Sequence, residues 1–156
     1  MYTELSSYSP VFMQFGCNAQ QARYVEKLFS QVSCVSWFEK LSVLWGGGRQ
    51  RLSTMADEIV GREPQYIGRK SVPLSQIQGS CNPGRCEEFD ADFSPCCLNS
   101  TQRWYSVAIA RLQGKQLPPI RLVEVDNSYF VSDGHHRVSV ASAFGDVNIE
   151  ADVIRC

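Results

Sequence analysis

The first part of the chain carries apolar residues at helical intervals. Beyond Asn18, a residue type that caps helices, the apolar positions are Val25, Leu28, Phe29, Val32, Val35, Phe38, Leu41, Leu44 and Trp45. This spacing predicts a helix that starts near residue 18, is interrupted at 33–36 and ends at the three glycines of 46–48.

A second helix is predicted from about Ser53 to Val60. Ser53 or Thr54 would cap it, and it ends before Pro64. With the first helix it makes up a predicted N-terminal helical extension over residues 1–65. Two interpretations of this extension stay open: an element that covers a sheet, or a surface for a partner or for a second copy of the chain.

Strand-like and helix-like segments alternate in the rest of the chain. Residues 70–80 alternate as in a short strand followed by a turn, and residues 81–100 are rich in turn formers. The remaining predicted elements are a helix at 102–115, a strand at 120–126, a tight turn at 127–128, a strand at 129–133, a helix at 136–144 and a strand at 148–154. The two strands that flank the tight turn predict a hairpin.

The composition is that of an ordinary globular domain. The 156 residues are 44% hydrophobic and 20% charged, and the net charge of −1 gives no overall basic field for nucleic acid. No apolar run approaches the roughly 18 residues of a membrane-spanning helix, so no membrane is expected as a partner. The N-terminus lacks the charged and apolar regions of a secretory signal, and we expect a cytoplasmic protein.

Seven cysteines are a high number for a chain of this kind. Four of them, Cys81, Cys86, Cys96 and Cys97, lie close together with the spacing C-x4-C-x9-C-C. This spacing lacks the paired C-x2-C of structural zinc sites, and cytosolic thiols are normally reduced. We interpret the cysteines as ordinary thiols, with a metal-binding or a redox role as the alternatives.

The densest chemistry lies at 129–145, "YFVSDGHHRVSVASAFG", where a predicted strand turns into a predicted helix. Unpaired backbone N–H groups and the helix dipole make the start of a helix attractive to anions. Gly134 permits a tight turn and a close approach of a ligand, and Arg137 has the fork that grips phosphate oxygens. We therefore predict a phosphate site formed by Gly134, His136 and Arg137.

Three residues of the same turn are candidates for catalysis. His135 and His136 are able to act as acid or base near neutral pH, and Asp133 is able to ligate Mg²⁺ or to cap the helix. The candidate catalytic residues are therefore His135, His136 and Asp133, with Asp133 as the candidate metal ligand.

Residues 117–145, "LPPIRLVEVDNSYFVSDGHHRVSVASAFG", resemble the hairpin and box of the ParB N-terminal domain and sulfiredoxin superfamily. The resemblance extends more weakly through "VPLSQIQGS" and covers about residues 70–154. It also includes a "GR…FD" stretch, as in stand-alone ParB-like proteins, here Gly84, Arg85, Phe89 and Asp90. The resemblance implies that the Gly-x-x-Arg box holds nucleotide phosphates. It also implies an α+β fold with a small mixed β-sheet and packed helices over residues 66–156, preceded by the helical extension.

The departures from this superfamily narrow the expected activity. Sulfiredoxins carry a catalytic cysteine immediately before the box histidine, and His135 occupies that position here, which argues against sulfinic-acid reduction. Partition ParB proteins end the box with two arginines, where this chain has His136 and Arg137. Some superfamily members are kinases of free serine and others are described as nucleases, so membership does not choose an activity.

The leading hypothesis is a protein that binds the phosphates of a nucleoside triphosphate, with Mg²⁺, at residues 133–137. Hydrolysis or phosphoryl transfer would follow from positioning and charge neutralisation. Arg85, Asp90 and Arg103 are the candidate outer contacts. A second hypothesis is a ParB-like nuclease or DNA-binding protein guided by the cations Arg49, Arg51, Arg62, Arg69 and Lys70. A third is a non-catalytic interaction module, and self-association through the N-terminal helices stays open.

Overall fold

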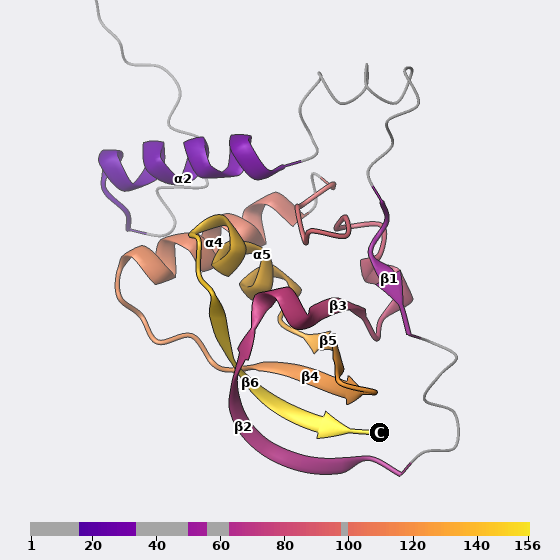
Figure 1. The fold of residues 1–156 in the computed structure, drawn as a ribbon. Helices are drawn as coiled ribbons and strands as arrows, with labels where there is room; N and C mark the ends of the chain where they lie inside the picture. The colour runs from indigo at the N-terminus through magenta and orange to yellow at the C-terminus, as the bar shows by residue number, and fades with distance from the viewer. Residues whose placement is uncertain (1–15, 34–49, 56–62, 98–99) are drawn as a thin grey trace, which may run out of the picture.

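A six-stranded mixed sheet organises the chain in the computed structural model, which describes residues 16–33, 50–55, 63–97 and 100–156 (Figure 1). Its strands are β1 (Ser53–Thr54), β2 (Gln65–Pro73), β3 (Ile77–Ser80), β4 (Ile120–Val125), β5 (Ser128–Asp133) and β6 (Asn148–Arg155). They lie in the order β1-β3-β5-β4-β6-β2. The pairs β1–β3, β3–β5 and β4–β6 are parallel, whereas β4–β5 and β6–β2 are antiparallel.

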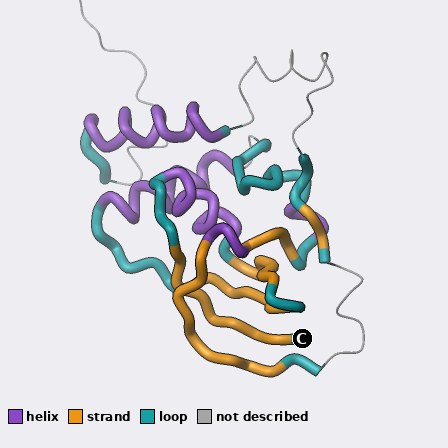
Figure 2. Tube along the Cα trace, in the orientation of Figure 1, coloured by secondary structure: helices purple, strands orange, loops and turns teal. Residues whose placement is uncertain are grey.

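The helices of the described chain gather on one side of the sheet (Figures 1 and 2). They are α2 (Ala19–Val32), α4 (Thr101–Leu112) and α5 (His135–Ala143), with short 3₁₀ turns at Leu74–Gln76 and Pro83–Arg85. Asn18 caps α2 as the sequence predicted, because its side chain accepts from the Gln21 backbone while the Gln21 side chain accepts from the Asn18 backbone.

Two apolar clusters hold these layers together. The first lies between the sheet and α5 and includes Leu122 and Val131 of the strands, Val138 of the helix, and the rings of Phe89 and Phe93. The second joins the three helices: Ala22, Val25, Phe29, Trp104, Ala108, Ile109 and Val140. Since α5 contributes to both clusters, the turn that starts it is held from two sides.

The predicted α+β fold, with a small mixed sheet and packed helices, is confirmed. The helix predicted from residue 18, the hairpin, the helix after residue 134 and the last strand form close to the expected bounds, and the helix predicted over 102–115 forms but ends three residues earlier, at Leu112. The hairpin turn lies one residue earlier than predicted, at Asp126 and Asn127, which both adopt positive φ. Asp and Asn tolerate that conformation better than other residues with side chains.

Two predicted elements differ from the structure. Ser53 and Thr54 do not begin a helix; they pair in parallel with Gly79 and Ser80 as strand β1, and residues 56–62 of the predicted helix lie outside the described part. The turn predicted to end 70–80 is strand β3, which pairs with β5. Both strands are too short for an apolar period to show, and their partners lie far away in the sequence.

The division at residue 65 stays a prediction. In the structure α2 packs its apolar face on α4 and α5, and β1 joins the sheet, so described segments before residue 65 contact the later part of the chain. The apolar face of α2 thus packs against α4 and α5 rather than against the sheet. The continuation of this helix beyond residue 33 falls outside the described residues, and self-association stays a prediction.

The described residues include no membrane-spanning helix, and their cysteines differ in oxidation state. No helix among them is both long and apolar enough to cross a bilayer. Cys17, Cys81, Cys86, Cys97 and Cys156 form no disulfide bond, whereas Cys96 is disulfide-bonded, so the cysteine cluster is not uniformly reduced as expected. Burial raises the pKa of Cys81 to about 11, so this thiol is a poor nucleophile at neutral pH.

Candidate functional site

A left-handed glycine joins strand β5 to helix α5. Asp133 ends the strand, and Gly134 has φ = 104° and occupies the cap position of the helix. A Cβ atom at this position would lie 2.5 Å from Cγ2 of Ile120, so a larger residue has neither the conformation nor the space. Because glycine has no side chain to cap with, the first N–H groups of α5 receive no side-chain cap.

The start of α5 opens into a cavity of about 360 Å³, here called the hinge pocket. It is lined by Arg85, Arg103, Ser106, Val107, Asp133, Gly134, His135, His136 and Arg137. A smaller hollow of about 230 Å³, here called the side pocket, is lined by Arg85, Glu88, Ser100, Arg103 and His136. Arg85, Arg103 and His136 line both pockets. The structure thus brings the predicted box residues together with two of the three predicted outer contacts.

The ring of His135 points into the protein core. Its Nε2 lies 2.7 Å from the Ser80 hydroxyl, and its ring stacks on Phe89 with 6.0 Å between centroids. The side chain is 5% exposed, and burial lowers its pKa to about 4, so it is neutral at pH 7. His135 is therefore held by Ser80 and Phe89, and it fixes the first turn of α5 against β3.

His136 is equally buried, but its ring is incompletely bonded. It packs edge-on against Phe89, and burial lowers its pKa to about 4 although the neighbouring Glu88 raises it. The ring hydrogen-bonds the backbone of Ser100, whereas Nε2 is buried without any hydrogen-bond partner. Leaving a buried polar atom unpaired costs folding free energy, so Nε2 is the least satisfied atom of this turn among the described residues.

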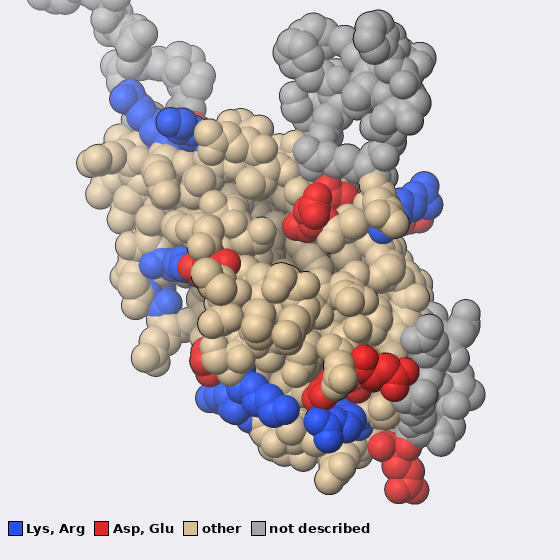
Figure 3. Space-filling model, in the orientation of Figure 1, with Lys and Arg blue, Asp and Glu red and all other residues tan. Residues whose placement is uncertain are grey.

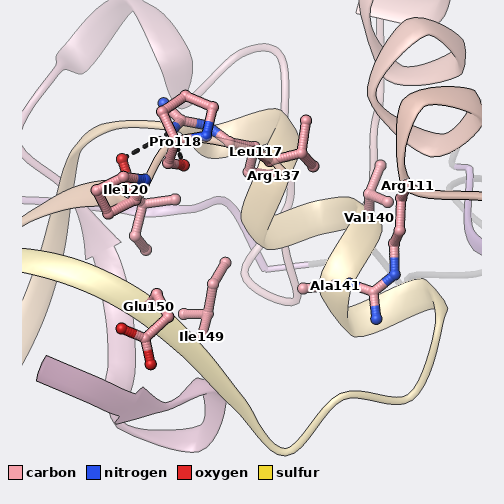
Figure 4. Close-up of a pocket in the computed structure, with 10 residues that line it drawn as sticks. Arg111, Leu117, Pro118, Ile120, Arg137, Val140, Ala141, Ile149 and Glu150 are labelled. Atoms are coloured by element: carbon pink, nitrogen blue, oxygen red, sulfur yellow. Dashed lines mark hydrogen bonds between the residues drawn. The ribbon is translucent and has the colours of Figure 1, made fainter. Parts of the chain in front are cut away.

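The guanidinium of Arg137 is engaged by the protein itself. Nη1 donates to the carbonyl oxygens of Pro118 and Pro119, the latter at 2.7 Å, and Nη2 donates to Oδ2 of Asp133 at 2.7 Å. Figure 4 shows this side chain beside a further cavity of about 110 Å³ between α5, the 117–120 segment and β6. Arg137 thus ties the helix to the 117–120 segment, and its fork is largely occupied.

The two outer arginines differ in how they are held. Arg85 donates from Nη1 to both carboxylate oxygens of Glu88, at 2.8 and 2.7 Å, and Glu88 also accepts from the Ser100 hydroxyl at 2.9 Å. These donors hold the pKa of Glu88 below its usual value although burial opposes them. Arg103, on α4, is exposed and makes no ion pair or hydrogen bond with the described chain. Its charge is available to an anion.

Asp90, the third predicted outer contact, does not reach the pocket. It is 4% exposed, and its Oδ1 accepts from the backbone N–H groups of Asp92 and Ser94. The carboxylate therefore shapes the 90–95 turn, which also bridges back to Arg51. The sequence around Asp90 gave no indication that its carboxylate would accept hydrogen bonds from the backbone of the turn that follows it.

The donor set does not fit a metal held by the protein alone. Within the described ranges no three His, Cys, Asp or Glu side chains cluster in a way that would hold an ion. Asp133 gives one oxygen to Arg137, and the Nε2 of His135 faces Ser80. Mg²⁺ is commonly bound by one or two carboxylates together with substrate phosphates. A magnesium ion at this site would therefore have to arrive on a nucleotide, and it stays a prediction.

The basic residues proposed to guide DNA are not gathered at the pocket. Arg69 pairs with Asp152 at 3.0 Å, and Lys70 lies 3.9 Å from Glu124, both on strand β2 at the edge of the sheet away from β5. Arg49 and Arg62 lie outside the described residues. On the face drawn in Figure 3, basic and acidic side chains are interspersed in small groups rather than forming a basic stripe.

Sequence reasoning missed Glu88, Ser100 and Ser106 as lining residues. Arg85 and Glu88 are three residues apart in the sequence, a spacing at which an ion pair forms across a single turn. This spacing could have indicated that Glu88 lies beside Arg85 at the site. Ser100 gave no such signal, because a serine at the start of a helix is common as a cap, whereas here its hydroxyl bonds Glu88.

Comparison with known proteins adds little beyond the fold. No family model and no curated protein matches the sequence. Among solved structures, the chain is similar to sulfiredoxin from Arabidopsis thaliana over 56% of this chain and 85% of that chain, with 24% sequence identity and a TM-score of 0.38. Similarity at this level carries no conclusion about activity, and the fold class rests on the sheet and helices described above.

Proposed function

We propose that the hinge pocket binds the phosphate groups of a nucleotide. The observation that carries the proposal is the convergence of Arg85, Arg103 and the uncapped start of α5 on one cavity. Backbone N–H groups at a helix start and arginine side chains are the donors that phosphate binding uses most. A volume of about 360 Å³ lies within the usual range for a ligand pocket, roughly 300–1,000 Å³.

Electrostatics in the pocket favour an anion over a cation. Three arginines line it, and Asp133 is the single carboxylate among its lining residues. Arg137 already neutralises Asp133, and Glu88 neutralises Arg85 from the side pocket. Arg103 therefore supplies the positive charge that no described acid balances. It is the residue on which phosphate affinity should depend most.

Arg137 plays an indirect part in this proposal. Because its Nη atoms hold Pro118, Pro119 and Asp133, it fixes the turn that presents the helix N–H groups. A phosphate in the pocket would meet the remaining guanidinium N–H groups at the rim. Loss of binding on changing Arg137 would thus mix a structural effect with a binding effect, which makes Arg103 the sharper test.

The experiment is calorimetric titration of ATP into the protein, with Mg²⁺ and then with a chelator. In Arg103→Gln, ATP affinity should fall by about 10- to 100-fold, because a charged hydrogen bond contributes about 1.5–3 kcal/mol. The matched control is Arg23→Gln, which removes the same charge from an exposed position on α2 and should leave affinity unchanged. Equal affinities in wild type and Arg103→Gln would contradict the proposal.

A short single-stranded DNA in the same titration separates the alternative. A protein that binds the DNA backbone loses affinity steeply as salt rises, whereas a compact nucleotide site changes less. Tight DNA binding without ATP binding would favour the nuclease or DNA-binding hypothesis. Absence of binding to both would favour the interaction module.

A further inference from the structure

An ion pair within the hinge pocket spans the turn between β5 and α5. Asp133 and Arg137 both line this cavity, together with Gly134. A Cβ atom at Gly134 would lie 3.1 Å from Nη2 of Arg137, so this nitrogen lies against the bare backbone at the start of α5. The same Nη2 donates to Oδ2 of Asp133 at 2.7 Å. The pair thus occupies a donor that stands beside the uncapped N–H groups of the helix.

The two partners of this pair are held to different degrees. The side chain of Arg137 is 15% exposed, and its Nη1 donates to the carbonyl oxygens of Pro118 and Pro119. The side chain of Asp133 is 65% exposed. An ion pair with an exposed partner contributes little to stability, because water solvates the charge and ordering the side chain costs entropy. The guanidinium is therefore fixed by the backbone, whereas the carboxylate is able to turn into water.

The pair is also weakly bonded in comparison with another ion pair of the same helix layer. Among the described residues, one hydrogen bond joins Arg137 to Asp133, whereas two join Arg111 to Asp146. A phosphate monoester carries a charge of about −1.5 to −2 at pH 7 and has three strong acceptor oxygens. Such a group bonds a guanidinium more strongly than a singly bonded carboxylate does. A phosphate at the start of α5 therefore competes well for Nη2.

Resting on the nucleotide binding proposed above, we infer that Asp133 is an internal competitor of the phosphate, which displaces it from Nη2 of Arg137. One ion pair breaks and another forms, and no covalent bond changes. Nη1 keeps its bonds to Pro118 and Pro119 during this exchange, so the turn stays in place. Asp133 thus covers the charge of Arg137 in the free protein and lowers the affinity of the pocket for phosphate. This role differs from that of the metal ligand predicted from the sequence, and the two roles predict opposite effects of removing the carboxylate.

The first test is calorimetric titration of ATP, in the presence of a chelator, into wild type and Asp133→Asn. Asparagine fills the same space without the charge, and a neutral hydrogen bond to Nη2 is about half as strong as a charged one. ATP affinity should therefore rise by about 3- to 10-fold. The matched control is Asp146→Asn, which removes the same charge and releases Arg111 beyond the other end of α5. It should leave affinity within about twofold of wild type, and circular dichroism confirms that both variants are folded.

A double-mutant cycle separates this exchange from simple repulsion. Removing a carboxylate from a pocket favours any anion through Coulomb energy alone, even if Arg137 has no part in binding. If Asp133 acts through Arg137, then Asp133→Asn in an Arg137→Gln background should change ATP affinity by less than about twofold. An equal rise in both backgrounds would show repulsion without exchange and would overturn the inference.

A crystal structure of the wild-type protein with ATP tests the exchange without any variant. Nη2 of Arg137 should then lie within hydrogen-bond distance of a phosphate oxygen, and Oδ2 of Asp133 should lie beyond about 3.5 Å from it. The bonds from Nη1 to Pro118 and Pro119 should remain. A pair that keeps its 2.7 Å separation beside bound ATP would contradict the inference.

The remaining outcomes of the titration separate this inference from the proposed function. A lower ATP affinity of Asp133→Asn in the chelator would make Asp133 a support of the site, and an affinity lowered by Mg²⁺-dependent loss alone would make it a metal ligand; either result overturns the inference. If Arg103→Gln weakens ATP binding and Asp133→Asn leaves it unchanged, the proposed function stands and the role of Asp133 fails. If ATP binds neither to wild type nor to Asp133→Asn, the proposed function fails, and the inference fails with it.

Discussion

The two walls of the hinge pocket contrast in how completely their polar groups are bonded. On the wall formed by Asp133 and Arg137, the guanidinium is shared among Asp133 and the carbonyl oxygens of Pro118 and Pro119, which lie behind the pocket wall. On the wall formed by α4 and the 81–97 loop, Arg103 has no described partner, and next to this wall Nε2 of His136 in α5 is buried and unpaired. A set of residues that looks uniform in the sequence is therefore divided into a supporting wall and a reactive wall.

The adjacent histidines repeat this contrast within two residues. His135 bonds Ser80 and stacks on Phe89, so it supports the turn. His136 leaves one nitrogen, Nε2, buried without a hydrogen-bond partner. Successive residues in the first turn of a helix point about 100° apart, which is enough to direct one ring at the sheet and the next at the pocket.

Gly134→Ala should have the largest effect, because both walls depend on this turn. A side chain there must adopt φ near 104° and would press on Ile120, so the free energy of unfolding should fall by about 3 kcal/mol or more. Gly145→Ala is the matched control, since Gly145 also has positive φ but has nothing within 4 Å of an added Cβ. Urea denaturation of both variants checks this, and equal losses would show that crowding by Ile120 is unimportant.

Arg137→Ala tests the supporting wall alone. Removing a guanidinium that is 15% exposed leaves the Pro118 and Pro119 carbonyls without their donor, so unfolding free energy should fall by about 2 kcal/mol. Arg103→Ala, on the reactive wall, should change it by less than about 0.5 kcal/mol. Chemical denaturation decides between the walls, and a loss in Arg103→Ala as large as that in Arg137→Ala would remove the contrast drawn here.

Stability should also depend on pH in the mildly acid range. The pKa of each buried histidine is lowered from 6.5 to about 4, so between these values the unfolded chain binds more protons than the folded one. Stability is therefore full above about pH 6.5 and falls as pH drops toward 4, lowering Tm by several degrees. In His136→Gln about half of this dependence should vanish, and calorimetry at pH 7 and pH 5 measures it. A Tm independent of pH in this range would contradict the burial of both rings.

Much of the fold was readable from local patterns. The helices at 18, 102 and 135, the hairpin and the last strand all carry apolar periods long enough to identify. Strand β1 was wrongly predicted as a helix start because serine and threonine also cap helices, and its two residues are strand only through pairing with β3. Pairing between segments about 25 residues apart leaves no local trace.

The site was predictable in its position and not in its bonding. The box at 133–137 does form a pocket at a helix start, together with Arg85 and Arg103. Arg137 is held by backbone carbonyls 18 and 19 residues earlier. This could not be inferred from the sequence, because every residue has a backbone carbonyl whatever its side chain. Likewise Asp90 became a candidate through the "GR…FD" stretch of the ParB-like resemblance, whereas its carboxylate accepts hydrogen bonds within a local turn.

The order of strands has a consequence for how the chain folds. Strand β2 finds its neighbour only in β6, where Gln65 aligns with Arg155, so this edge of the sheet closes across most of the chain. Long-range pairing slows folding because loop-closure entropy must be overcome before the contacts form. Until β6 has formed, β2 is an unpaired strand that could pair with a strand of another molecule. The bulge between Tyr66 and Gly68, the charges of Arg69 and Lys70, and Pro73 are the devices that discourage such aggregation.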